Sequence, residues 1–285
     1  MKRFAIVALF AISCGALPAH AQALSLSYHT GDTYKYSFHS ATKQTIVAAG
    51  MTLPADIDIA AGEVVKVKSV DSTGVSDLTL TLSHVVMKST TAGAADTAAG
   101  IPDITMDVKV AADGRVVSVD GNALAANNPF LALSGTGGGF FITAVLPGGA
   151  VKPGDTWSND YSQANPGGTG SGAIKITSRS KYLRDESLSG VNAAVVETTS
   201  NGSFDVNLGT PPAGAAAGGA PGISMKGTVT SDVTTWVDPS GHRILKSHMT
   251  QTSAGTLDLG SNAMFSGLAG PMTIKGTGTT DLTPA

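Results

Sequence analysis

Cysteine is almost missing from this chain. The one cysteine, Cys14, lies in the first 21 residues. One thiol cannot form an intramolecular disulfide, and structural zinc sites need several closely spaced Cys or His ligands. The fold must therefore be stabilised by its core, without covalent cross-links.

Charged residues are also scarce, at 14% of the chain, and the formal net charge is −3. Loss of Lys2 and Arg3 with an N-terminal signal would leave 16 basic and 21 acidic residues, a net charge of −5. Nucleic-acid binding needs a concentrated basic face. The charge balance argues against that class of partner.

Hydrophobic runs long enough to span a membrane are missing too. The apolar run Phe4–Ile12 is about half of the roughly 20 residues that a membrane-spanning helix needs. It follows Lys2 and Arg3 and precedes the small-residue site Ala19–Ala21. This arrangement is typical of a secretory signal peptide over residues 1–21, with Gln22 as the first mature residue. We expect an exported protein, periplasmic or extracellular, with no transmembrane segment in its mature part.

The minor alternative for the N-terminus is a lipid anchor on Cys14. Ala11-Ile12-Ser13-Cys14 resembles a bacterial lipoprotein motif, but it lacks the usual leucine three residues before the cysteine. The cleavage site at Ala21 is the better match, so soluble export is the leading expectation.

Apolar and polar residues alternate with a period of two, and not with the period of a helix. This alternation is typical of strands with one buried face. Tyr34, Tyr36 and Phe38 alternate with polar residues, as do Leu78, Leu80 and Leu82. Turn-forming pairs with Gly or Asn separate such runs and favour antiparallel hairpins. The sequence predicts a mainly β protein.

Two motifs occur twice in the same order. Gly31-Asp32-Thr33-Tyr34 returns as Gly154-Asp155-Thr156-Trp157, and the turn at Asp113-Gly114 returns at Ser240-Gly241. We therefore predict two duplicated antiparallel β units, residues 22–123 and 151–285, packed as a half-barrel or a sandwich. The connecting segment, 124–150, contains the apolar run Phe140–Leu146, for which a short helix that plugs the core and a buried strand are both open.

The repeated Gly-Asp-Thr-aromatic motif is interpreted as structural. Gly31 with Asp32, and Gly154 with Asp155, suit a turn in which the Asp side chain accepts hydrogen bonds from backbone amides. The aromatic residue that follows, Trp157 in the second copy, is then expected to enter a strand with its ring in the core.

Motifs for catalysis, cofactors and metals are weak. Gly168–Ala173 has the letters of a dinucleotide fingerprint, but the strand-like Ile174-Lys175-Ile176 follows where a helix is required. His242 and His248 would lie about 20 Å apart on a continuous strand, too far for one metal ion. A nucleophile elbow of the form G-x-S-x-G is also missing. We expect no metal and no cofactor, and the sequence identifies no catalytic residues.

The segments Val151–Trp157 and Asp238–Gly241 resemble those of uncharacterised exported bacterial β-rich proteins. More distantly, long alternating strands around a short plug resemble the lipoprotein-carrier (LolA-like) half-barrels. That resemblance implies an apolar ligand held in an open β cavity.

The leading functional hypothesis is a non-catalytic protein that binds an apolar or amphipathic ligand, such as a lipid, between its β units. Six residues are the candidate cavity walls: Tyr34, Tyr36, Phe38, Leu78, Leu80 and Leu82. Two alternatives stay open: a structural or surface-interaction protein without a small-molecule ligand, and a hydrolase with a site built from loops. No protein partner is identified.

Overall fold

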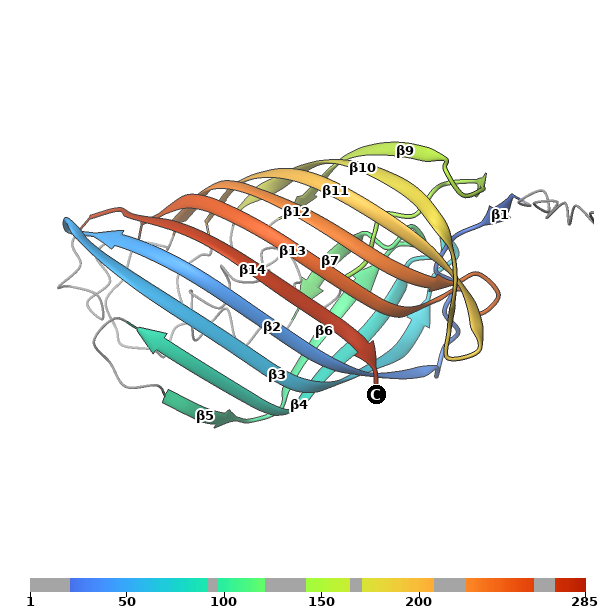
Figure 1. Ribbon diagram of the computed structural model, residues 1–285, viewed down its shortest axis with the longest axis horizontal. Helices are drawn as coiled ribbons and strands as arrows, with labels where there is room; N and C mark the ends of the chain where they lie inside the picture. Colours follow the sequence, from blue (N-terminus) through green and yellow to red (C-terminus); the bar gives the residue numbers. More distant parts are fainter. Residues whose placement is uncertain (1–20, 92–96, 121–141, 165–170, 208–223, 259–269) are drawn as a thin grey trace, which may run out of the picture.

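The computed structural model describes residues 21–91, 97–120, 142–164, 171–207, 224–258 and 270–285 (Figure 1). The predicted signal peptide, the alternative anchor Cys14, residues 124–141 of the connecting segment and Gly168–Gly170 lie outside these ranges. In the described ranges about three quarters of the residues belong to strands, and none belongs to a helix that could cross a membrane. The prediction of a mainly β protein is confirmed.

The strands, in chain order, are β1 (Gln22–Ala23), β2 (Thr33–Ala48), β3 (Met51–Val70), β4 (Ser76–Thr91), β5 (Thr97–Ile101), β6 (Ile104–Val110), β7 (Val116–Asp120), β8 (Ala150–Val151), β9 (Thr156–Ala164), β10 (Ser171–Leu188), β11 (Val191–Asn207), β12 (Ser224–Asp238), β13 (Arg243–Asp258) and β14 (Met272–Pro284). Seven of these strands are 15 residues long or longer. Such lengths carry each strand from one end of the molecule to the other (Figure 1).

Twelve strands form one antiparallel sheet in the order β7-β6-β4-β3-β2-β14-β13-β12-β11-β10-β9, with β5 paired to β4. The short strands β1 and β8 pair separately. The two halves of the chain are joined where β2 pairs with β14, from Tyr36 opposite Pro284 to Val47 opposite Thr273. The predicted halves therefore share one sheet.

The sheet curls into a half-barrel rather than a sandwich (Figure 1). Its two edges approach each other, since the Arg115 guanidinium, just before β7, lies 5.2 Å from the ring centroid of Tyr161 in β9. Right-handed twist accumulates across so many strands and bends an open sheet onto itself.

Two irregular segments cross the inside of one end, which we call the plugged end. In the N-terminal segment, the amide of Leu26 donates to the Ala112 carbonyl (2.7 Å) and that of Ser27 to the His242 carbonyl (2.9 Å). Leu24, Leu26 and Tyr28 are each at most 5% exposed. The segment thereby adds apolar side chains to the core of the half-barrel.

The second plug is Ile142–Leu146, for which a short helix or a buried strand was expected. Both expectations are wrong for these residues, which are buried but irregular. The barrel wall satisfies their amides: Ala144 donates to Thr235 Oγ1 (2.7 Å) and Val145 to Thr198 Oγ1 (3.0 Å). Because these side-chain acceptors replace a ladder or helical turn, the segment can be buried without secondary structure.

The two copies of the repeated turn make matching hydrogen bonds. The Asp32 amide donates to His29 O and the Asp155 amide to Lys152 O, both at 3.0 Å. In each turn the Asp carboxylate also accepts from the backbone amide three residues earlier, at 3.0 Å. Gly31 and Gly154 both have a positive φ, 95° and 99°, which favours glycine.

Candidate functional site: the concave face of the sheet

Alternation along each strand directs every second side chain into the curl. In β2 the buried residues Tyr36, Phe38, Ser40, Thr42 and Gln44 alternate with exposed or half-buried ones. Directly paired residues on neighbouring antiparallel strands share a face, so the cross-strand registers extend this set over the whole concave face. Along the strands the concave face is apolar, then polar, then apolar again.

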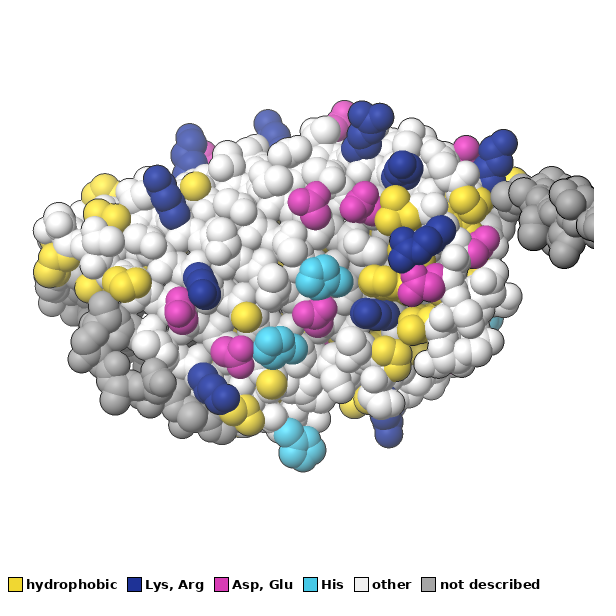
Figure 2. Space-filling view, viewed as in Figure 1, with side chains coloured by type: hydrophobic (Ala, Val, Ile, Leu, Met, Phe, Trp, Pro, Cys, Tyr) yellow, Lys and Arg dark blue, Asp and Glu magenta, His cyan; other side chains and the backbone are white. Residues whose placement is uncertain are grey.

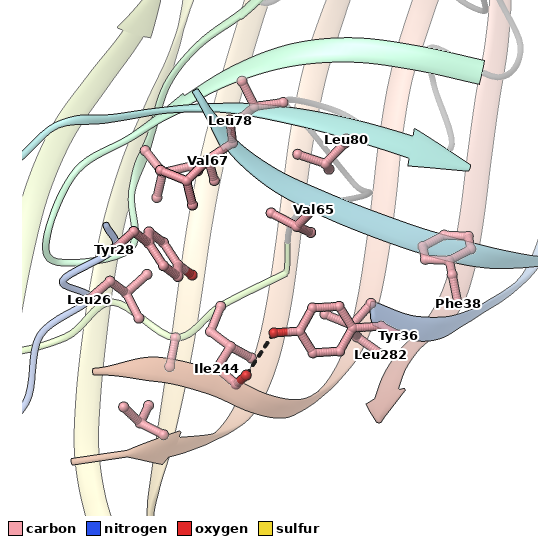
Figure 3. Close-up of a cluster of buried hydrophobic side chains, with 14 of the residues drawn as sticks. Leu26, Tyr28, Tyr36, Phe38, Val65, Val67, Leu78, Leu80, Ile244 and Leu282 are labelled. Atoms are coloured by element: carbon pink, nitrogen blue, oxygen red, sulfur yellow. Dashed lines mark hydrogen bonds between the residues drawn. The ribbon is translucent and has the colours of Figure 1, made fainter. Parts of the chain in front are cut away.

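The first zone is a large hydrophobic cluster at the plugged end (Figure 3). It contains five of the six residues predicted from the sequence: Leu78, Leu80 and Leu82 are fully buried, Tyr36 is 7% exposed and Phe38 is 3% exposed. Tyr34 is partly buried and packs against the cluster. The structure thus brings all six together in a packed core, and a ligand-lining role for them stays a prediction.

Glu63 is an ionisable residue inside this apolar zone. It lies on the concave side of β3, opposite Tyr36 in β2 and Leu82 in β4, and is 1% exposed. Neither carboxylate oxygen has a hydrogen-bond partner among the described residues. Burial raises the pKa of Glu63 to about 8, so the side chain is mostly neutral at pH 7.

Glu63 was missed because an acidic residue in a strand is ordinarily assigned to the solvent face. The available signal was its parity: it stands two residues from Ala61 and two from Val65, on the buried side of the alternation in β3. Burial also raises the pKa of the neighbouring Tyr36, whose hydroxyl donates to the Ile244 carbonyl at 2.7 Å.

The second zone is a belt of small polar side chains across the middle of the concave face. Ser40 and Thr280 form a hydrogen bond between β2 and β14 (3.2 Å), and Ser180 and Thr198 form one between β10 and β11 (2.7 Å). We call the zone the polar belt; its buried members are Ser40, Thr42, Gln44, Ser178, Ser180, Thr198 and Thr280. In these pairs each hydroxyl group has a hydrogen-bond partner, which offsets the free-energy cost of burying it in a protein core.

The third zone is a separate hydrophobic cluster beyond the belt, which we call the distal cluster. Its buried members are Ala48, Ile174, Phe204, Val206, Met225, Leu257, Met272 and Ile274. Ile46 and Ile176 are only partly buried and pack against it. None of these residues is among the six cavity walls predicted from the sequence.

Glycines on the concave face make room beside the distal cluster. Gly227 and Gly255 are paired across β12 and β13. A Cβ atom at either position would come within 2.7 or 3.2 Å, respectively, of Phe204 Cζ. The Phe204 ring therefore lies across backbone that has no side chains, which is a known way for an aromatic ring to cover glycines in a sheet.

A narrow cavity lies where the belt meets the distal cluster. Gln44, Phe204, Ser253, Gly255 and Ile274 are among the residues that line it, and about 10 Å³ is open to the centre of a water molecule. That is room for about one water-sized group. Gln44 is 6% exposed, and its Oε1 has no hydrogen-bond partner among the described residues.

The convex face carries a wider groove of about 960 Å³, lined largely by threonines and a few charged residues. Two cross-strand rows line it: Thr230, Thr252, Thr277, Lys43, Asp56 and Thr90 form one. The second row, Asp232, Thr250, Thr279, Ala41, Asp58 and Lys88, runs beside it. Uncharged polar side chains and backbone dominate this face, with charges dispersed among them (Figure 2).

Histidine and aspartate side chains pair next to this groove. His39 Nε2 lies 3.0 Å from an Asp58 oxygen, and His248 Nδ1 lies 2.7 Å from an Asp281 oxygen. In the part of the chain that the structure describes, no group of three His, Cys, Asp or Glu residues is placed to hold a metal ion.

The last motif residue, Trp157, connects the repeated turn to the plug. Its Nε1 donates to the Val145 carbonyl at 2.9 Å, while the ring packs against the large cluster. Trp157 therefore holds Ile142–Leu146 against the first residues of β9.

No known family model matches the chain, and no curated protein matches its sequence.

Proposed function

We propose that this is an exported, non-catalytic carrier, periplasmic or extracellular, that holds an amphipathic ligand such as a lipid against the concave face of its half-barrel. The observation that supports it is the order of the three zones. A polar belt beside an apolar cluster is itself amphipathic, and a ligand of matching polarity can lie across the boundary.

The energetics favour a ligand with a substantial apolar part. Burial of apolar surface contributes about 25 cal/mol per Å², whereas a typical hydrogen bond contributes only about 1 kcal/mol net. The distal cluster would hold the ligand's chain, and the belt would orient its polar end. A catalytic role has no comparable support, since the buried polar groups of the belt are hydroxyls and amides.

The matching turns at Asp32 and Asp155 support the further proposal that the half-barrel arose from two duplicated β units, residues 22–123 and 151–285. The strands that follow the two turns, β2 and β9, occupy comparable places: each starts its half of the sheet. In this arrangement a ligand on the concave face touches both units.

Native mass spectrometry of the protein purified from its own host tests the carrier function. We expect an adduct of lipid-like mass that is released under denaturing conditions. Phe204→Ala should reduce the bound fraction, because it removes the aromatic ring of the distal cluster, whereas the matched change of an exposed convex-face residue, Thr252→Ala, should not. A protein that carries no adduct, and binds none from mixed-lipid vesicles, would exclude the carrier function.

The convex groove favours a second candidate, a surface-interaction protein. Thr250, Thr252, Thr277 and Thr279 make no side-chain hydrogen bond to another described residue, so their hydroxyls are available to a partner. Replacement of Thr252 and Thr277 by Val, which keeps the β-branched shape, would reduce such an interaction and leave adducts on the concave face unchanged.

A further inference from the structure

We propose that Gln44 selects the ligand, with its Oε1 accepting a hydrogen bond from a neutral donor, a hydroxyl or amide N–H, at the head of an amphipathic molecule whose chain lies on the distal cluster. This inference rests on the proposed carrier function and names the chemistry of its ligand.

Gln44 stands at the boundary between the two relevant zones. It follows Ser40 and Thr42 on the concave side of β2, and Ile46, the next residue on that side, packs against the distal cluster. Across the sheet Gln44 lies opposite Gly276. A Cβ at Gly276 would lie 3.3 Å from Gln44 Cγ, so the side chain extends over backbone that carries no side chain of its own.

The unpartnered acceptor points to a ligand group. A buried acceptor without a donor costs free energy, and buried side-chain amides ordinarily find partners. Ser40 and Thr280, in the same belt, pair with each other, but Gln44 Oε1 has no partner among the described residues. The acceptor would be satisfied by a donor brought in from outside the chain.

The size and charge of the cavity limit that donor. Room for about one water-sized group fits a single hydroxyl or amide N–H. Among the described residues that line the cavity none is charged, so a phosphate or carboxylate there would have no cation from this lining to compensate its desolvation. The ligand class is therefore a neutral amphipath with a hydrogen-bond donor, of the kind found in long-chain alcohols, acylglycerols and ceramides.

Decan-1-ol and decyl methyl ether test this inference, because they share an apolar chain but only the alcohol donates. Competition against a bound fluorescent naphthylamine probe would give both affinities. For the full-length protein we expect the alcohol to bind about 5-fold more tightly, the typical net effect of one neutral hydrogen bond. In Gln44→Met, which keeps the shape but removes the acceptor, the two affinities should become equal.

Thr45→Val, a change of the neighbouring exposed residue on the convex side, is the matched control and should keep the discrimination. Equal affinities in the unmodified protein would mean that the cavity holds only water, and would overturn the role of Gln44 while leaving the carrier function intact. Discrimination that persists in Gln44→Met would overturn it as well. If neither compound nor the probe binds, the carrier function itself fails. The ratio in the unmodified protein tests the hydrogen bond even if a variant does not fold.

Discussion

Glu63 and Tyr36 face each other across β3 and β2, yet they do not form a hydrogen bond. The Tyr36 hydroxyl donates instead to the Ile244 carbonyl in β13, at 2.7 Å. The carboxyl group is left unpaired in the hydrophobic cluster, and the described charged residues do not lower its pKa. Glu63 therefore makes the plugged end sensitive to pH.

We expect the free energy of unfolding to fall as the pH rises. Burial raises the folded-state pKa of Glu63 from 4.5 to about 8, so the folded state binds the proton more tightly than the unfolded chain does. The favourable contribution is complete below about pH 4.5, is lost as the pH rises through about 8, and amounts to a few kcal/mol. Urea unfolding at several pH values between 5 and 9 measures it.

Glu63→Met should flatten this profile and increase stability at pH 8, because it replaces a buried ionisable group by an apolar one of similar length. Glu197→Gln, at an exposed position of β11, is the control and should leave the profile as it is. A stability that does not change from pH 5 to 9 in the unmodified protein would contradict the assignment of Glu63 as a buried, neutral acid.

Asp155→Ala should lower stability by about 1 kcal/mol, the typical net value of a hydrogen bond, because the Lys152 amide loses its acceptor. Ligand binding should be retained, since the turn lies outside the concave face. Chemical denaturation gives the first quantity and adduct mass the second. Loss of ligand from a variant that stays folded would instead assign the turn a binding role.

The sequence predicted the strand class because strands follow from local alternation and turn chemistry, but it left a half-barrel and a sandwich both open. Tyr36, Phe38 and the three leucines of β4 were also correctly expected on one face. Their position relative to the plugs could not be predicted, because it depends on which distant segment crosses the curl. The irregular conformation of Ile142–Leu146 depends on hydroxyl acceptors of Thr198 and Thr235, more than 50 residues away.

The polar belt and Gln44 were missed for a related reason. Ser40, Thr42 and Gln44 continue the buried parity of Tyr36 and Phe38, but small polar residues in a strand are ordinarily assigned to solvent. Pairs such as Ser40 with Thr280 are separated by 240 residues and form only when the first and last long strands meet. Their place on the buried side of the alternation in β2 was the signal that could have indicated the polar belt and Gln44.

Glycine positions on the concave face should differ in their tolerance of alanine. At Gly227 a new Cβ would lie 2.3 Å from the Ala254 carbonyl oxygen and 2.7 Å from both Gly255 Cα and Phe204 Cζ, which forces the backbone to move. At Gly278 the nearest atom, Thr42 Oγ1, is 3.2 Å away and belongs to a side chain. We expect Gly227→Ala to cost about 1–3 kcal/mol, as overpacking does, and Gly278→Ala clearly less. Equal costs in thermal or urea unfolding would contradict the closer approach of neighbouring backbone at Gly227 than at Gly278.

Trp157→Phe should loosen the plug without removing its apolar contacts. The change deletes the hydrogen bond from Nε1 to the Val145 carbonyl, at a cost of about 1 kcal/mol, and keeps an aromatic ring in the cluster. Hydrogen exchange followed by mass spectrometry should show faster exchange in peptides that cover residues 142–149, with little change in β11 or β12. Trp236→Phe, at the other tryptophan, where Lys246 Nζ lies 4.5 Å from the ring centroid, is the comparison and should not alter exchange in the plug. Unchanged exchange at 142–149 in Trp157→Phe would mean that Thr198 and Thr235 hold the plug in place without the indole.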